Sequence, residues 1–215
     1  MQAGEDDEAE RILLGALEIE PQDSELQFCL SQVLQKGQRL EPAVQAVQRA
    51  IELEPQNAKY RASLADLLVQ QGQTDDAEAT LRQALGDGVE TGPIQYRLSR
   101  LLRGEKRLDE ALVAASAAVK LDPKKVSYRT NWGTLLMEAG HNEEAERVLT
   151  DGVAIAPEDA ELHFRLSQIL QKRNQLKAAV QAAQRATELK PKNAKYQNNL
   201  VRLLRLKESE ITASS

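Results

Sequence analysis

The chain is poor in cysteine and in aromatic residues. Cys29 is the only cysteine among 215 residues, which excludes an internal disulfide and any metal site built on several thiolates. Aromatic residues make up 3% of the chain, so the core of a β-sandwich or barrel, which relies on aromatic and β-branched side chains, is disfavoured. Because such sparse cysteine suits a reducing compartment, we expect a cytoplasmic location.

Long apolar runs and an excess of positive charge are also absent. No apolar stretch approaches the roughly 20 residues that a membrane-spanning helix needs. The formal net charge is -5, so the field of the whole molecule repels nucleic-acid phosphates and anionic lipids. We therefore expect neither a nucleic acid nor a membrane as partner.

Patterns that signal catalysis or metal binding are missing as well. His141 and His163 are 22 residues apart and match no metal-binding spacing. The glycines form no phosphate-binding loop. Cys29 has no neighbouring histidine to activate its thiol. We expect no catalytic residues, no metal, no cofactor and no enzymatic activity.

The sequence does contain an internal repeat of 34 residues. Five of the seven prolines share this step: Pro21, Pro55, Pro123, Pro157 and Pro191. A leucine column and an alanine column follow the same step: Leu34, Leu68, Leu102, Leu136, Leu170 and Leu204, and Ala9, Ala43, Ala77, Ala111, Ala145 and Ala179. Between these marks apolar residues recur at helical spacing, with a break near Gly37 and a stop at Pro55. Each unit is therefore predicted to be a pair of helices.

This pattern resembles the tetratricopeptide repeat (TPR) family over almost the whole chain. The small residue of the family's first helix is matched by Ser31, Ala65, Ser99, Gly133 and Ser167. The packed alanines of its second helix are matched by Ala43, Ala50 and their equivalents, while Gly152 and Val89 depart from the pattern. The resemblance implies an all-α fold in which helix-turn-helix repeats stack into a right-handed superhelix, an α-solenoid.

We expect a single domain over residues 8–207, bounded by disordered ends at 1–7 and 208–215. The period gives a half motif, five full repeats and a final helix: 8–23, then 24–57, 58–91, 92–125, 126–159 and 160–193, then 194–207. Glycines at 86, 88 and 92 surround the missing proline, which suggests a looser turn between the second and third repeats.

A longer period of 68 residues runs through the aromatic residues. It relates two series: Phe28, Tyr96 and Phe164, and Tyr60, Tyr128 and Tyr196. Duplication of a pair of repeats explains it. Two interpretations stay open: the aromatics form the core between repeats, or they line a groove.

A binding function follows from the resemblance and from the distribution of charge. In TPR proteins the first helices line a concave groove, which suits an extended partner. The first 14 positions of the five repeats together with 194–207 carry 14 basic and 5 acidic residues, whereas the remainder of the chain has a net charge of -14. A basic inner layer favours an acidic ligand at short range.

The residues expected in this groove belong to two columns of the first helices. They are Arg97, Arg100, Asn131, Thr134, Arg165, Gln168, Asn199 and Arg202. Arginine offers a planar fork for carboxylates, and asparagine both donates to and accepts from a peptide backbone. The residues of the family's carboxylate clamp, which binds chaperone C-termini, are not present in three successive repeats. We expect a non-catalytic scaffold that binds an extended, acidic polypeptide segment. The alternative is the accessory TPR region of a larger glycosyltransferase or sulfotransferase, used for binding substrate proteins or for oligomerisation.

Apolar residues at both ends of the array predict an interface. Ile12 and Leu14 lie in the first half motif, and Leu203 and Leu206 lie in the final helix. Terminal units lose one neighbour and expose their packing face unless a polar cap covers it. We expect a homodimer through a terminal edge, or a neighbouring repeat in a larger parent protein.

Overall fold

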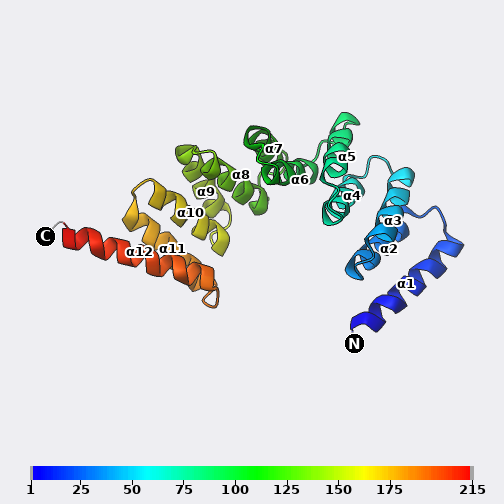
Figure 1. Ribbon diagram of the computed structural model, residues 1–215, viewed down its shortest axis with the longest axis horizontal. Helices are drawn as coiled ribbons and strands as arrows, with labels where there is room; N and C mark the ends of the chain where they lie inside the picture. Colours follow the sequence, from blue (N-terminus) through cyan, green and yellow to red (C-terminus); the bar gives the residue numbers. More distant parts are fainter. Residues whose placement is uncertain (1, 214–215) are drawn as a thin grey trace. The chain divides into compact units, whose positions relative to one another are not determined.

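The computed structural model describes residues 2–213 as α-helices joined by short turns (Figure 1), and these residues contain no strand. The helices are α1 (Gln2–Ile19), α2 (Ser24–Lys36), α3 (Leu40–Leu53), α4 (Ala58–Gln70), α5 (Thr74–Gly86), α6 (Gly92–Gly104), α7 (Leu108–Leu121), α8 (Val126–Glu138), α9 (Asn142–Ile155), α10 (Ala160–Lys172), α11 (Leu176–Leu189) and α12 (Ala194–Ala213). The predicted all-α class is confirmed.

The chain divides into two compact units at the turn between α6 and α7. Unit 1 ends at Glu105 and unit 2 begins at Lys106. Each predicted repeat range contains one pair of helices, but the two helices of the range 92–125 belong to different units. The sequence predicts one continuous domain, with its loosest turn near Gly88.

The turn near Gly88 is instead well formed. Gly88 has a φ of +81°, and the amide of Val89 donates to the carbonyl oxygen of Ala84 at 2.8 Å, which closes the end of α5. Val89 is 4% exposed, so it fills a buried place although it replaces the usual proline. A left-handed glycine with this hydrogen bond is a common way to end a helix.

Polar caps start several of the first helices. The Asp23 carboxylate accepts from the amide of Leu26, and the Asp159 carboxylate accepts from the amide of Leu162, each at 2.9 Å. Such caps satisfy amides that have no partner within the helix. The prolines of the repeat follow the second helices, where the missing amide prevents further helical hydrogen bonding.

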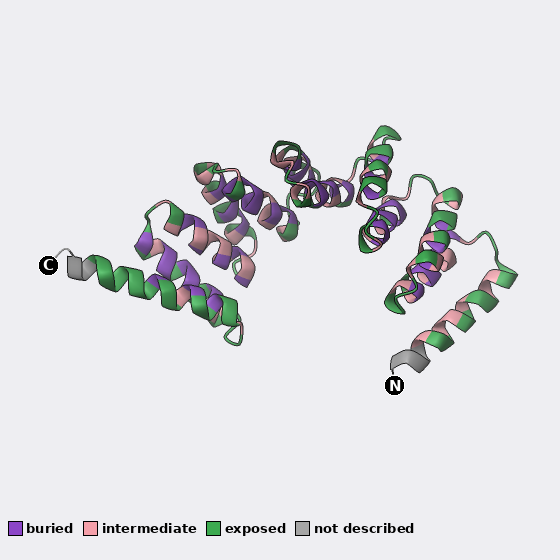
Figure 2. Cartoon of the chain, viewed as in Figure 1, coloured by how far each residue is buried: buried purple, intermediate pink, exposed green. Residues whose placement is uncertain are grey.

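The leucine and alanine columns form the core of both units (Figure 2). All five alanines from Ala43 to Ala179 have an exposed fraction of 0%, and the five leucines from Leu34 to Leu170 are exposed by 8% or less. An alanine side chain lets two helix axes approach closely, so a buried alanine column sets the spacing of the stack. The columns read from the sequence are thus the packing surfaces of the fold.

Two glycines permit the closest approaches in unit 2. A Cβ atom on Gly133 would lie 2.7 Å from Cδ2 of Leu149, and one on Gly152 would lie 2.9 Å from Cδ2 of Leu162. Real Cβ atoms keep a greater distance, so these positions accept glycine because a leucine from a neighbouring helix fills the space. The departure of Gly152 from the family pattern therefore has a packing reason.

Both ends of the chain are more helical than the sequence suggests. Residues 2–7 and 208–213, predicted to be disordered, lie within α1 and α12, while residues 1, 214 and 215 lie outside the described part. Asp6 accepts a hydrogen bond from Nζ of Lys36 at 2.5 Å, which holds the start of α1 against the end of α2. Composition alone did not show this contact.

Candidate binding grooves

Arg97 and Arg100 lie in a groove of unit 1. Its volume is about 420 Å³, and we call it the unit-1 groove. It is lined by Gln35, Ala65, Asp66, Val69, Gln70, Leu81, Arg97, Arg100 and Leu101. Nε of Arg97 donates to Oδ2 of Asp66 at 2.7 Å, so part of the positive charge is neutralised within the groove. The guanidinium of Arg100 lies 5.7 Å from the ring centroid of Tyr96, an exposed cation–π contact.

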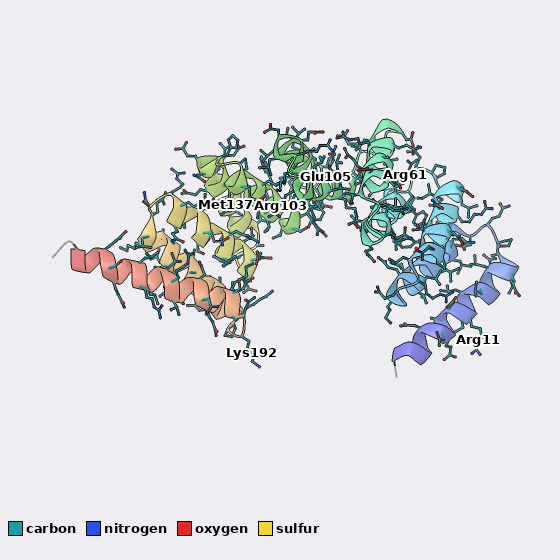
Figure 3. All side chains as sticks on the ribbon, in the orientation of Figure 1. Arg11, Arg61, Arg103, Glu105, Met137 and Lys192 are labelled. Atoms are coloured by element: carbon teal, nitrogen blue, oxygen red, sulfur yellow. The ribbon has the colours of Figure 1, made fainter. Side chains whose placement is uncertain are left out.

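Thr134, Arg165, Gln168 and Arg202 line a second groove, in unit 2. Its volume is about 410 Å³, and we call it the unit-2 groove. The remaining lining residues are Met137, Glu138, Gln171 and Lys172, of which Met137 is labelled in Figure 3. The lining therefore holds three basic side chains and one acidic one, and it is the more positive of the two grooves.

Neighbouring polar groups hold the basic side chains of the unit-2 groove. Nε of Arg165 donates to Glu161 at 2.7 Å, and Nη2 of Arg202 donates to Oδ1 of Asn199 at 3.0 Å. Nζ of Lys172 donates to the carbonyl oxygen of Met137 at 3.0 Å. Each of these cations keeps further donors, because a guanidinium has five N–H bonds and an ammonium has three.

Asn131, Thr134 and Asn199 are buried rather than presented to solvent. Their exposed fractions are 9%, 6% and 7%. Nδ2 of Asn199 donates to Oγ of Ser167 at 2.8 Å, and Oγ1 of Thr134 donates to the carbonyl oxygen of Thr130 at 2.7 Å. Asn131 and Asn199 do not line either of the two grooves, although Arg97 and Arg165 of the same column do.

Most of the aromatic residues belong to the core between repeats, as the first of the two open interpretations holds. Five of the six residues in the two aromatic series are exposed by 5% or less, and Tyr96 is half-buried. The rings of Phe28 and Tyr60 lie 5.0 Å apart at 33°, and those of Phe164 and Tyr196 lie 5.1 Å apart at 34°. A lysine covers the phenylalanine in both pairs, with Nζ of Lys59 and Lys195 at 4.3 and 4.2 Å from the ring centroids.

A glutamate completes each of these aromatic junctions. The hydroxyl of Tyr196 donates to Glu161 at 2.9 Å, and burial together with this bond raises the pKa of Tyr196 to about 12. Burial alone would raise the pKa of Glu161, but the bond from Tyr196 and the charges of Arg165 and Lys195 outweigh it and lower that pKa. Tyr196 is therefore a firm hydrogen-bond donor, and Glu161 remains an anion beside the unit-2 groove.

The four predicted interface residues differ in exposure. Ile12, Leu14 and Leu206 are exposed by 62%, 47% and 39%. Leu203 is completely buried, in a cluster with residues of α10 and α11 that includes Leu170, so its assignment to an exposed patch is wrong. The final helix packs on unit 2 through this side chain, and its free face lies elsewhere.

The described part of the chain contains no arrangement of side chains typical of a catalytic or metal site. No group of three or more histidine, cysteine or acidic side chains is placed there to hold a metal ion. His141 is exposed, and a ring nitrogen of His163 lies 2.9 Å from the carbonyl oxygen of Pro157. None of the helices described is both long and apolar enough to cross a bilayer.

Sequence reasoning missed several residues of the grooves. Asp66 lies one repeat before Arg100 in the same column, and its pairing with Arg97 becomes visible only in the structure. Lys172 and Met137 lie at the ends of first helices, outside the two columns considered. The repeat register could have identified Lys172, because it lies one turn beyond Gln168 on the same helix.

Several solved structures have the same fold. One is described as YrrB, a TPR protein with an unusual peptide-binding site; it is 20% identical with a TM-score of 0.67, and the match covers 86% of this chain and 96% of that one. PilF of Pseudomonas aeruginosa is 19% identical with a TM-score of 0.74, covering 89% and 87%. MamA of Desulfovibrio magneticus RS-1 is 23% identical with a TM-score of 0.64, covering 73% and 89%. At these identities the likeness shows the fold alone.

Family membership rests on the sequence itself. The comparison with curated proteins gave no significant match. The family model described as tetratricopeptide repeat matches residues 33–101, 102–163 and 136–204, which together take in most of the chain. The paired helices and the buried alanine column agree with this match, so the chain belongs to the tetratricopeptide repeat family.

Proposed function

We propose that this protein is a non-catalytic scaffold that binds an extended, acidic polypeptide segment, with the unit-2 groove as the principal site. TPR proteins typically serve as protein-interaction scaffolds. The observation that carries the proposal is the set of three cations, Arg165, Lys172 and Arg202, around one groove of about 410 Å³.

Chemistry of the lining suits the carboxylates and the backbone of an acidic polypeptide. Arginine forks bind carboxylates through paired hydrogen bonds, and the neighbouring amides of Gln168 and Gln171 suit a peptide backbone. Met137 supplies an apolar contact among these polar groups. An acidic segment that carries occasional apolar side chains matches this lining.

The unit-1 groove is proposed as a weaker site for the same class of ligand. Asp66 pairs with Arg97 much as Glu161 pairs with Arg165, but only two cations line this groove, against three in the unit-2 groove. Arg100 remains exposed beside Tyr96 and offers a cation next to an aromatic ring. The role of an accessory region in a larger enzyme gains no support from any of these features.

The experiment uses a fluorescent probe peptide of alternating glutamate and leucine residues, titrated with the whole chain. We expect binding that weakens as salt rises, because the attraction is between charges close to solvent. The double change Arg165→Gln with Arg202→Gln should weaken binding by about tenfold or more, since two charge-assisted contacts are lost.

A matched control keeps the same change of net charge away from the groove. Arg147 and Arg185 are exposed and lie on the second helices α9 and α11 of the same unit. Changing both to glutamine should leave binding nearly unaltered. Equal losses in the two double variants would show that only net charge matters, and the groove assignment would then fail.

A further inference from the structure

Helix α1 exposes an apolar residue at a position that is buried in the interior repeats. Ile12 of α1 is 62% exposed, whereas its equivalents in the repeats are exposed by 8% or less in four of five cases: Ala46, Ala114, Val148 and Ala182. The other side of α1 lies against α2. Ile12 therefore faces the place that a first helix occupies in a complete repeat.

Helix α12 also exposes apolar residues at positions that are buried in the preceding repeat. Val201 and Leu204 are exposed by 47% and 37%, whereas their equivalents Ser167 and Leu170 in the preceding repeat are exposed by 0% and 7%. Leu203 is buried against α11, so the opposite side of α12 is already occupied. The exposed pair therefore faces the place of a second helix.

Within the described residues, α1 therefore lacks a first helix as its neighbour, and α12 lacks a second helix. In repeat register α1 is a second helix without a first, and α12 is a first helix without a second. We propose that α12 of one copy binds α1 of another copy, so that the two helices form a pair across the contact. The proposal concerns assembly and does not rest on the groove function.

Charge favours this arrangement. The sequence of α1 carries six acidic and one basic residue, and that of α12 carries four basic and two acidic ones, so their net charges are opposite. Opposite charges guide encounter and exclude the pairing of two like ends. Contacts between two copies of α1, or between two copies of α12, would bring like charges together.

The chain already shows how an acidic α1 meets basic residues of a first helix. Lys36 at the end of α2 pairs with Asp6 at 2.5 Å, and Arg39 just beyond it pairs with Glu10 at 2.6 Å. In an antiparallel pair the acidic start of a partner's α1 would lie beside the second half of α12, which carries Arg205 and Lys207 before Glu208 and Glu210.

Side-chain size limits the strength of the contact. In an interior repeat, a small residue on the first helix leaves room for a larger side chain on the second helix, as Gly133 does for Leu149. At the proposed contact Val201 would meet Leu13, and neither is small. The two helices therefore sit further apart than in an interior repeat, and we expect reversible association.

The contact joins two different surfaces, so it does not close by itself. Each added copy leaves one free α1 and one free α12, which produces rings or open chains rather than a symmetric pair. This differs from the homodimer expected from the sequence. The assembly state consequently depends on concentration and on salt.

The test uses two variants that each block one end. Ile12→Lys adds a charge to the free face of α1, and Leu204→Lys adds one to the free face of α12. Both positions are exposed, so folding should persist, as circular dichroism would show. Leu14→Lys is the matched control, because Leu14 is exposed but its equivalents Gln48, Arg82, Thr150 and Gln184 are exposed too.

Sedimentation velocity of the unmodified chain should give masses above 23.8 kDa that rise with concentration and fall with salt. Each end variant alone should be monomeric, and the Leu14→Lys control should still assemble. An equimolar mixture of the two end variants should form a 1:1 heterodimer and stop there, because only one intact pair of ends remains.

Three results would overturn the proposal. The first is a monomeric unmodified chain at every concentration. The second is assembly that survives in either end variant alone, which would indicate a contact between two copies of the same helix. The third is a mixture of the two end variants that stays monomeric although the unmodified chain assembles.

Discussion

The hydroxyl of Tyr196 on α12 donates a 2.9 Å hydrogen bond to the carboxylate of Glu161 on α10. Tyr60 on α4 makes the same 2.9 Å bond to Glu25 on α2. In both cases the tyrosine ring also lies against a phenylalanine of the glutamate's own helix. The bond therefore links the first helices of consecutive repeats at a fixed register.

Alkaline pH should weaken this junction. The pKa of Tyr196 is raised from its ordinary value of 10.0 to about 12, so the folded state holds the phenolic proton more tightly than the unfolded state does. Its contribution to stability is complete below pH 10 and is lost as the pH rises toward about 12. Urea unfolding across this range should show a steeper fall in stability for the parent than for Tyr196→Phe. Equal slopes would contradict the assignment.

Loss of a core leucine should be costly. Leu136 is 3% exposed and lies in a cluster with Ala145 and Leu149. Leu136→Ala should lower the free energy of unfolding by about 2 to 5 kcal/mol, because it removes buried apolar surface and leaves a cavity. Thermal unfolding measures the effect. Val113→Ala is the control, since Val113 is 71% exposed and should change stability little.

Gly133 and Leu149 should be energetically coupled. Gly133→Ala gains about 1 kcal/mol of helix propensity but should lose about 1 to 3 kcal/mol by overpacking against Leu149, so the net effect is destabilising. In a Leu149→Ala background the obstruction is gone, and the same change should stabilise the protein. A double-mutant cycle by urea unfolding tests this reversal of sign. Additive effects would show that the contact imposes no constraint.

Turns between paired helices should respond to glycine. Gln38 has a φ of +58°, a left-handed conformation that the equivalent positions Gly72 and Gly140 adopt without a side-chain penalty. Gln38 is exposed, so no packing is lost on substitution. Gln38→Gly should raise the free energy of unfolding by about 0.5 to 1 kcal/mol, because a residue other than glycine is strained there. The neighbouring change Gln35→Gly, inside α2, should instead lower it.

Most of the architecture could be predicted from the sequence because the same pattern occurs in every repeat. Each buried column, such as the alanines from Ala43 to Ala179, has the same residue type in successive repeats, so chance alone would rarely produce it. The paired helices and the buried leucines were therefore predicted in the right places. The turn at Gln38 could not be predicted, because its glycine lies one residue earlier, at Gly37, whose φ is -75°.

The grooves were less predictable than the core. A helical column gives the direction of a side chain only to within a fraction of a turn. Asn199 was therefore assigned to the groove, although it bonds to Ser167 inside the stack. Leu203 was likewise assigned to the surface one residue away from Leu204, which is exposed. Such choices depend on how a neighbouring helix is rotated, and repeat spacing does not contain that information.

The near identity of the two aromatic junctions has a consequence for how the chain folds. During refolding, the face of α2 that receives Tyr60 offers nearly the same fit to Tyr196. The incorrect partner is about fivefold more distant along the chain, which costs only about 1.4 kcal/mol more in loop-closure entropy. Proximity alone therefore favours the correct docking over this alternative by roughly tenfold.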